Sequence, residues 1–331
     1  MKKRMREVLV IIVLRCAGVL WGWTVYVQDR NEPIDVIYIP KIIDDTNEFW
    51  SSLLAGAKMA AQEYNVNLRI VAAESELDYE GQNEWILWAV EQKPDAIMIS
   101  ACDYNGTLAA ARKVKESGIP LIFVDSNVEE PLEDCMVSTD NFIAGTRLGE
   151  LAKQMISDGT KIAVVSHVKN SSTAKERMDG IAYALDESAG QIVQVVYGDS
   201  DYAQAQRVTS ELLNDYPDIG LIIATNEYSA VGAVRAVKNA GRQNEIAMIG
   251  FDNSIEQVQF LEEGILEGIV LQKSFNMGYL GVQQAAAIVR GEPYQRHIDS
   301  GSATITLENM QEPESQKLLF PFIQKEYQYK K

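Results

Sequence analysis

The chain has 331 residues, more than one typical domain, which favours two lobes of about 100–200 residues each. Its formal net charge of −17 would repel the phosphates of nucleic acids, so the composition argues against nucleic-acid binding. The histidines, His167 and His297, and the cysteines, Cys16, Cys102 and Cys135, form no cluster with metal-ligand spacing. We therefore expect neither a metal nor a cofactor.

Residues 1–30 predict a segment that engages a membrane. Basic residues crowd the first six positions and precede the apolar stretch Val8–Val27, which at about 20 residues is long enough to span a bilayer. The basic end is expected to stay in the cytoplasm and the remainder of the chain to lie outside it. The segment is either a lipoprotein signal modified at Cys16 or an uncleaved signal anchor. Arg15 stands where a lipoprotein signal has a small residue, which favours the anchor.

From residue 34 onward, short apolar runs alternate with segments of helical period. The first runs are rich in β-branched residues and predict buried strands. They are Asp35–Pro40, Leu68–Ala72, Ala96–Ile99, Leu121–Val124 and Met136–Ser138. The helical segments between them are Glu48–Tyr64, Glu80–Gln92 and Leu108–Glu116.

A second series of the same kind begins after Asp140. Its predicted strands are Lys161–Val165, Ile192–Tyr197, Leu221–Ala224, Ile246–Gly250 and Gly268–Leu271. Its predicted helices are about Phe142–Met155, Ala174–Leu185, Ala203–Leu213 and Ser229–Asn239. Strands that alternate with helices favour parallel sheets with right-handed crossovers. The two series therefore predict an α/β fold with two similar, doubly wound lobes, and a ligand at the carboxyl ends of the strands.

Polar side chains follow most of these strands. They are Asn47, Asp125, Arg177, Asn226, Asp252 and Gln272. Carboxylate, amide and guanidinium groups can each serve two neighbouring hydroxyls as donors, acceptors or both. Phe49 and Trp50 lie close to Asn47 in the sequence, and Tyr202 follows the strand Ile192–Tyr197. These aromatic rings can stack against the C–H faces of a sugar ring. Polar groups with aromatic walls indicate a site for a neutral polyol.

These residues make the chain resemble the ribose-type periplasmic sugar-binding proteins, which have the type I periplasmic binding protein fold. The resemblance extends from Ile34 to about Leu319 and rests on short motifs in matching order and at compatible spacing. They are Asn47–Trp50, Gly118–Asp125, Ser138–Gly145, Ala174–Gly180, Thr225–Glu227 and Ile249–Asp252.

The resemblance implies a role for each residue of the predicted site. The six polar residues that follow the strands would bind sugar hydroxyls, and Phe49, Trp50 and Tyr202 would form the stacking walls. Lys41 and Ser100 stand where the family often has a serine and an asparagine that contact the sugar, and Thr139 replaces another serine. Gln272 favours a pentose such as ribose or xylose.

The resemblance also implies lobes that are discontinuous in sequence. The first would hold residues 34–139 plus 273–299, and the second residues 140–272 plus 300–331. Three hinge strands near Thr139, Gln272 and Ser300 would join the lobes and allow them to close around the ligand.

Two functions remain open at this point. The chain either delivers a monosaccharide to an ABC permease, or it is a membrane-anchored sensor whose closed state is read by a histidine kinase. An uncleaved anchor favours the sensor. A DNA-binding repressor would need a helix-turn-helix before the first lobe, where residues 1–33 are basic and then apolar. No phosphate loop, G-x-S-x-G motif or histidine–nucleophile pair is present in the sequence, so we do not expect an enzyme.

Overall fold

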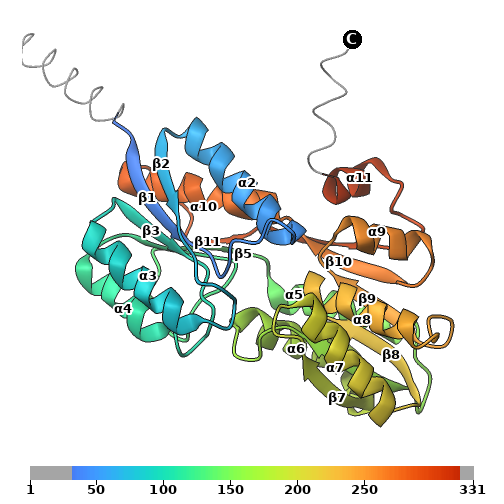
Figure 1. The fold of residues 1–331 in the computed structure, drawn as a ribbon. Coiled ribbons are helices and arrows are strands. Elements are labelled where there is room, and N and C mark those ends of the chain that lie inside the picture. The colour runs from blue at the N-terminus through green and yellow to red at the C-terminus, as the bar shows by residue number, and fades with distance from the viewer. Residues whose placement is uncertain (1–31, 321–331) are drawn as a thin grey trace, which may run out of the picture.

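Two α/β lobes lie side by side in the computed structural model, which describes residues 32–320 (Figure 1). The predicted anchor, residues 1–30, and residues 321–331 of the predicted second lobe lie outside the described residues. Between residues 32 and 320, no helix combines the length and the apolar character that a membrane crossing requires.

The first lobe is built on a six-stranded sheet in the order β11-β5-β4-β3-β1-β2, and every pair of neighbours is parallel. Its strands are β1 (Ile34–Ile39), β2 (Val66–Ile70), β3 (Ala96–Ile99), β4 (Leu121–Val124), β5 (Cys135–Ser138) and β11 (His297–Asp299). Helices α2 (Glu48–Glu63) and α10 (Ser274–Val289) pack on one face, and α3 (Tyr79–Gln92) and α4 (Leu108–Ser117) on the other. Because both faces are covered, the central strands β3 and β4 are apolar and buried throughout.

The second lobe repeats this plan with a sheet in the order β12-β10-β9-β8-β6-β7. Its strands are β6 (Lys161–Ser166), β7 (Ile192–Tyr197), β8 (Ile219–Ala224), β9 (Ala247–Phe251), β10 (Gly268–Gln272) and β12 (Ser302–Ile305). One face carries α5 (Asn141–Lys153) and α6 (Ser172–Leu185), followed by a 3₁₀ helix, Asp186–Gln191. The other face carries α7 (Tyr202–Asp215), α8 (Glu227–Asn239) and α9 (Ile255–Glu262), with α11 (Pro313–Leu319) at its edge.

The structure confirms the two α/β lobes and adds one strand to each predicted sheet. The added strands, β11 and β12, are short and half polar, so they leave no apolar run in the sequence. Strand β12 pairs antiparallel with β10, which corrects the expectation of purely parallel sheets. The chain turns back at Gly301, whose φ of 86° suits glycine, and so enters the second sheet in the opposite direction. Helices α9, α10 and α11 are likewise absent from the predicted elements.

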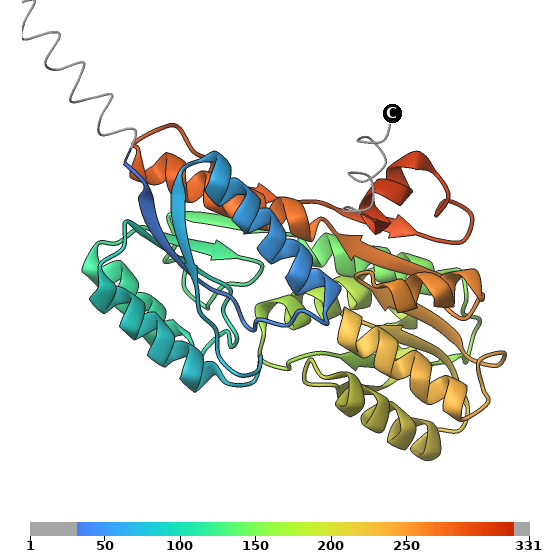
Figure 2. The same ribbon diagram turned by 45° about the horizontal axis from the view of Figure 1, so that its top comes forward.

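Within the described residues the chain passes between the two sheets three times: after β5, after β10, and between β11 and β12 (Figure 2). Hydrogen bonds join the three connections. The Thr139 and Ser300 hydroxyls lie 3.3 Å apart, the Ser300 amide donates to Ser138 O at 2.8 Å, and Lys273 N donates to Gly301 O at 3.3 Å. Short connections of this kind can absorb a rotation of one lobe against the other.

Candidate functional site

A cavity with about 310 Å³ of empty space, part of it open to solvent, lies between the lobes at the carboxyl ends of the strands. Most of the predicted site residues line it: Lys41, Asn47, Phe49, Trp50, Asp125, Arg177, Asn226, Asp252 and Gln272. Five residues that the sequence did not single out for the site complete the wall: Glu76, His167, Thr173, Glu227 and Tyr228.

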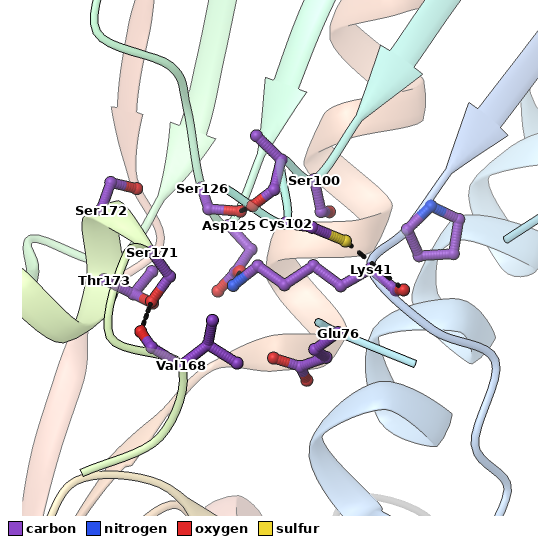
Figure 3. A network of polar contacts seen from close by, with 12 residues as sticks. Lys41, Glu76, Ser100, Cys102, Asp125, Ser126, Val168, Ser171, Ser172 and Thr173 are labelled. Atoms are coloured by element: carbon purple, nitrogen blue, oxygen red, sulfur yellow. Dashed lines mark hydrogen bonds and ion pairs between the residues drawn. The ribbon is translucent and has the colours of Figure 1, made fainter. Parts of the chain in front are cut away.

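A buried ion pair forms the first-lobe side of the cavity. Lys41 follows β1 and Asp125 follows β4, and their Nζ and Oδ2 atoms lie 2.8 Å apart with both residues only 3% exposed (Figure 3). Burial by itself would lower the pKa of Lys41, but the carboxylates of Asp125 and Glu76 reverse this and raise it, so the ammonium stays charged. The pair offers adjacent donors and acceptors to the hydroxyls of a ligand.

Glu76 fixes the aromatic wall of the cavity. Its Oε1 accepts a 2.8 Å hydrogen bond from the indole Nε1 of Trp50, and its Oε2 accepts one of 2.9 Å from Ser200 in the second lobe. Burial raises the pKa of Glu76, and Lys41 counteracts that rise. The rings of Phe49 and Trp50 meet edge to face, with centroids 5.0 Å apart. The indole is thereby held in one orientation at the cavity.

Arg177 of α6 projects from the second lobe and is held by several contacts at once. Its Nε donates to Asn141 Oδ1 at 2.9 Å, and its Nη1 donates to the Thr225 carbonyl at 2.6 Å. Its guanidinium carbon lies 3.8 Å from the ring centroid of Phe251. These contacts fix a planar cation at the cavity wall, where it can bind ligand oxygens.

The position of Arg177 depends on the close crossing of α5 and α6. A Cβ atom added at Gly145 of α5 would lie 2.2 Å from the Arg177 carbonyl oxygen, and one at Gly180 would lie 2.2 Å from the Phe142 carbonyl oxygen. Glycine at both positions lets the two helix backbones touch. The crossing therefore sets how far Arg177 reaches into the cleft.

Asp252 and Gln272 form the second-lobe counterpart of the ion pair. Asp252 follows β9, accepts from Gln272 Nε2 at 2.8 Å and accepts from the Glu227 amide at 3.2 Å. Burial raises the pKa of Asp252 to about 6, and the nearby Arg177 opposes the rise. Gln272 Oε1 is buried and has no hydrogen-bond partner within the described part of the chain. An unsatisfied buried acceptor at a cavity wall calls for a donor on the ligand.

Two asparagines cap helices at the edge of the cavity. Asn47 Oδ1 accepts from the Trp50 amide at 3.1 Å and starts α2, while Asn226 Oδ1 accepts from the Ser229 amide at 2.9 Å and starts α8. The cap fixes each asparagine side chain at the start of its helix. The helix starts lie beside the carboxyl ends of the strands, where the cavity is.

Three predicted site residues are not brought to the cavity wall. Ser100 is buried behind it, with its hydroxyl 2.8 Å from Tyr38 OH. Thr139 lies in the connection that follows β5, where its hydroxyl is 3.3 Å from that of Ser300. Tyr202 donates its hydroxyl to Glu227 Oε1 at 2.6 Å and so supports a cavity residue.

The cavity residues that the sequence analysis missed differ in how far the sequence pointed to them. His167 follows β6 directly and is buried. Its Nδ1 lies 3.0 Å from Thr225 Oγ1 and its Nε2 lies 2.8 Å from Thr173 Oγ1. Burial lowers the pKa of His167 well below its ordinary value, so the ring is neutral. Glu76 lies in a loop beyond β2 without any periodic pattern, and its role becomes visible only in three dimensions.

The fold and the cavity define the class of two-lobed binding proteins, with a polar cavity between the lobes. The sequence matches the family model of the periplasmic binding protein domain over residues 37–293. This chain belongs to the ribose-type periplasmic sugar-binding protein family. Because this is a family of binding components of sugar transporters, the chain is a binding protein and not an enzyme.

Three relatives illustrate the match. A sugar transporter structure from Clostridium phytofermentans is 43% identical, with a TM-score of 0.79, and the match covers 82% of this chain and 99% of that one. A carbohydrate transporter solute-binding protein from Agrobacterium radiobacter in complex with D-arabinose is 26% identical, with a TM-score of 0.79 and coverage of 87% and 99%. The D-ribose/D-allose-binding protein of Pseudomonas aeruginosa is 23% identical over 303 residues, 89% of this chain and 94% of that protein.

Proposed function

We propose that this chain binds a single monosaccharide in the cavity between its lobes and delivers it, outside the cytoplasm, to the permease of a sugar ABC transporter. One observation carries the proposal: donors and acceptors from both lobes face one small cavity. The Lys41–Asp125 pair comes from the first lobe, and Arg177 and the Asp252–Gln272 pair come from the second. A ligand with several hydroxyls satisfies such a set.

We propose a pentose, such as ribose or xylose, as the ligand. The cavity is small, and Gln272 offers an unpaired acceptor at its wall. The named ligands of the relatives support a monosaccharide, because they include D-ribose, D-allose, D-arabinose and D-fucose. The nine predicted residues at the cavity wall are the proposed contacts, and Ser100, Thr139 and Tyr202 do not line the cavity.

The proposed mechanism is closure of the cleft. The lobes, residues 34–139 plus 273–299 and residues 140–272 plus 300 onward, would rotate about the three connections at Thr139, Gln272 and Ser300. A permease that contacts both lobes can then distinguish the liganded protein from the empty one. Attachment through residues 1–30 would keep the protein at the membrane beside that permease. The relatives are named as transport components, which supports delivery over sensing by a histidine kinase.

A thermal-shift panel tests the proposal. The purified chain would be heated with ribose, xylose, arabinose, galactose, glucose or allose at millimolar concentration. A sugar that binds only the folded state raises the midpoint in proportion to RT ln(1 + [L]/Kd), so micromolar affinity gives a clear shift. We expect the largest shift from a pentose. The absence of a shift with every sugar would overturn the proposal.

A further inference from the structure

Two glutamates cross the cleft, and each binds the start of a helix in the opposite lobe. Glu227 of the second lobe accepts at Oε2 from the backbone amides of Glu48, at 2.9 Å, and Phe49, at 3.2 Å, in the first turn of α2. In the other direction, Glu48 Oε1 accepts from the amide of Ile255, the first residue of α9, at 3.0 Å. Each lobe therefore supplies a glutamate side chain that caps the start of a helix in the other lobe.

This exchange completes a helix that the first lobe cannot complete alone. The first amides of a helix have no partner within the helix and need an acceptor from elsewhere. Asn47 satisfies the Trp50 amide from within the first lobe. The two preceding amides find their acceptor on Glu227 of the other lobe. Opening the cleft would separate these groups and leave both amides to water.

Glu227 also connects this contact to the sugar site. Its side chain is buried with the residue 1% exposed, and its Oε1 accepts from the Tyr202 hydroxyl at 2.6 Å. Its backbone amide donates to Asp252 Oδ2 at 3.2 Å. Glu227 thus contacts both Asp252, a carboxylate at the cavity wall, and the start of α2. Its loss should affect the relative position of the two lobes.

Two further hydrogen bonds cross the cleft beside this contact. Tyr228 OH donates to Asp44 Oδ2 at 2.6 Å, and Ser200 Oγ donates to Glu76 Oε2 at 2.9 Å. All of these bonds join protein groups directly, without any contribution from a ligand. They stabilise the closed arrangement of the lobes in their own right.

We propose that Glu227 and Glu48 form a latch that sets how long the cleft stays closed. The latch depends on the proposed function in one respect, which is that the molecule it retains is a sugar. A contact made only in the closed state raises the closed population of the empty protein and slows the escape of a bound ligand. Glu227 acts as a positioning residue here, through the start of α2.

Single-molecule fluorescence transfer between the lobes tests the latch on the full chain. The dyes would sit on cysteines introduced at the exposed residues Lys113 of α4 and Lys238 of α8, in a Cys16→Ser background. Cys102 and Cys135 are buried and will not compete for label. Sugar dissociation would be followed in parallel by stopped-flow tryptophan fluorescence.

Four variants separate a latch from a general structural effect. Glu227→Ala should open the sugar-free protein measurably and speed dissociation about tenfold, because the shared acceptor of two amides at the start of α2 is lost. Glu227→Gln keeps an acceptor oxygen and should stay within about threefold of the wild type. Glu48→Ala, outside the cavity wall, should act in the same direction but less, since Ile255 is 63% exposed. Glu63→Ala is the matched control: it removes a glutamate from the far end of α2 whose partner, Tyr279, is in the same lobe.

The outcomes are distinct. The latch would be overturned if both Glu227→Ala and Glu48→Ala kept the transfer efficiency and the sugar dissociation rate of the wild type. It would also be overturned if Glu63→Ala changed these quantities as much as the other two variants. If no sugar binds to any variant while Glu227→Ala still opens the empty protein, the latch stands and the proposed function fails.

Discussion

Asp125 and Asp252 occupy equivalent positions in the two lobes. Each is the first residue after a strand, β4 or β9, and each has a left-handed φ, 70° and 63° respectively. Each donates its amide to a valine carbonyl, Val137 O at 3.0 Å and Val270 O at 2.9 Å. Positive φ is uncommon for a residue with a side chain, although aspartate tolerates it better than most. Each lobe therefore presents one carboxylate to the cavity by the same backbone turn.

Lys41→Met should destabilise the fold strongly. Removal of one partner of a buried ion pair leaves the other charge uncompensated, which typically costs about 3–5 kcal/mol of unfolding free energy. Urea denaturation followed by circular dichroism measures the change. Lys113→Met is the control, because its partner Glu116 is exposed and little should change. Recovery in Lys41→Met/Asp125→Leu is expected, and a Lys41→Met variant as stable as the wild type would show that the pair is not buried.

Gly145→Ala should weaken sugar binding without touching the sugar. The new methyl group would lie 2.2 Å from the Arg177 carbonyl oxygen and 2.8 Å from its Cα, so α6 must move and carry the guanidinium with it. We expect a loss of affinity of about tenfold by isothermal titration, the size of one lost charged hydrogen bond. Gly190→Ala in the same lobe meets no atom within 4 Å and should bind like the wild type. Equal affinity in both variants would mean that the crossing does not position Arg177.

Sugar affinity should fall as the pH drops below about 6. Asp252 has its pKa raised to about 6 by burial, so it is mostly ionised at neutral pH and accepts hydrogen bonds at both oxygens. Protonation removes one acceptor. The free energy of unfolding depends on pH in the opposite direction. The native state binds this proton more tightly than the unfolded chain does, because Asp252 has its ordinary pKa of 3.8 when the chain is unfolded. The stability contributed by this group is therefore full below about pH 4 and is lost between about pH 4 and 6.

Titration calorimetry at several values between about pH 5 and 7 measures the affinity change. The comparison is Asp252→Asn, which should bind more weakly at neutral pH and show a flat profile. A wild-type profile as flat as that of the asparagine variant would exclude Asp252 as the titrating group.

Substitutions behind the cavity should matter less than substitutions at its wall. Ser100→Ala removes a hydroxyl that bonds Tyr38 and does not line the cavity, so the affinity should stay within about threefold of the wild type. Fluorescence titration of the tryptophans gives the affinity. A loss of tenfold or more would place Ser100 in contact with the sugar, as the family resemblance implies.

Most of the cavity wall could be predicted because it follows a rule about strand ends. Asp125, Asp252 and Gln272 each come directly after an apolar run, and parallel strands bring those ends to one edge. The strands that complete the sheets could not be predicted, since β11 and β12 have only three and four residues and pair through the backbone. Sequence pattern carries little information about such short edge strands.

The contacts across the cleft were beyond prediction for a different reason. Glu227 appeared in the motif Thr225–Glu227, yet the amides that donate to its side chain lie far away in the chain, at Glu48 and Phe49. Local pattern indicates which face of an element is buried, and it does not indicate which distant amide a carboxylate will meet. Lys41 was predicted to contact sugar, and its ion pair with Asp125 was equally invisible in the sequence.

Isothermal titration of the best sugar from the panel tests the central claim most directly. The wild type should bind one sugar per chain, and Asp125→Ala and Arg177→Ala should each weaken binding by about tenfold or more, because each removes a charged hydrogen-bonding group from a different lobe. Such a result would place the ligand between the lobes. Unchanged affinity in both variants would contradict the account and place the sugar elsewhere on the protein.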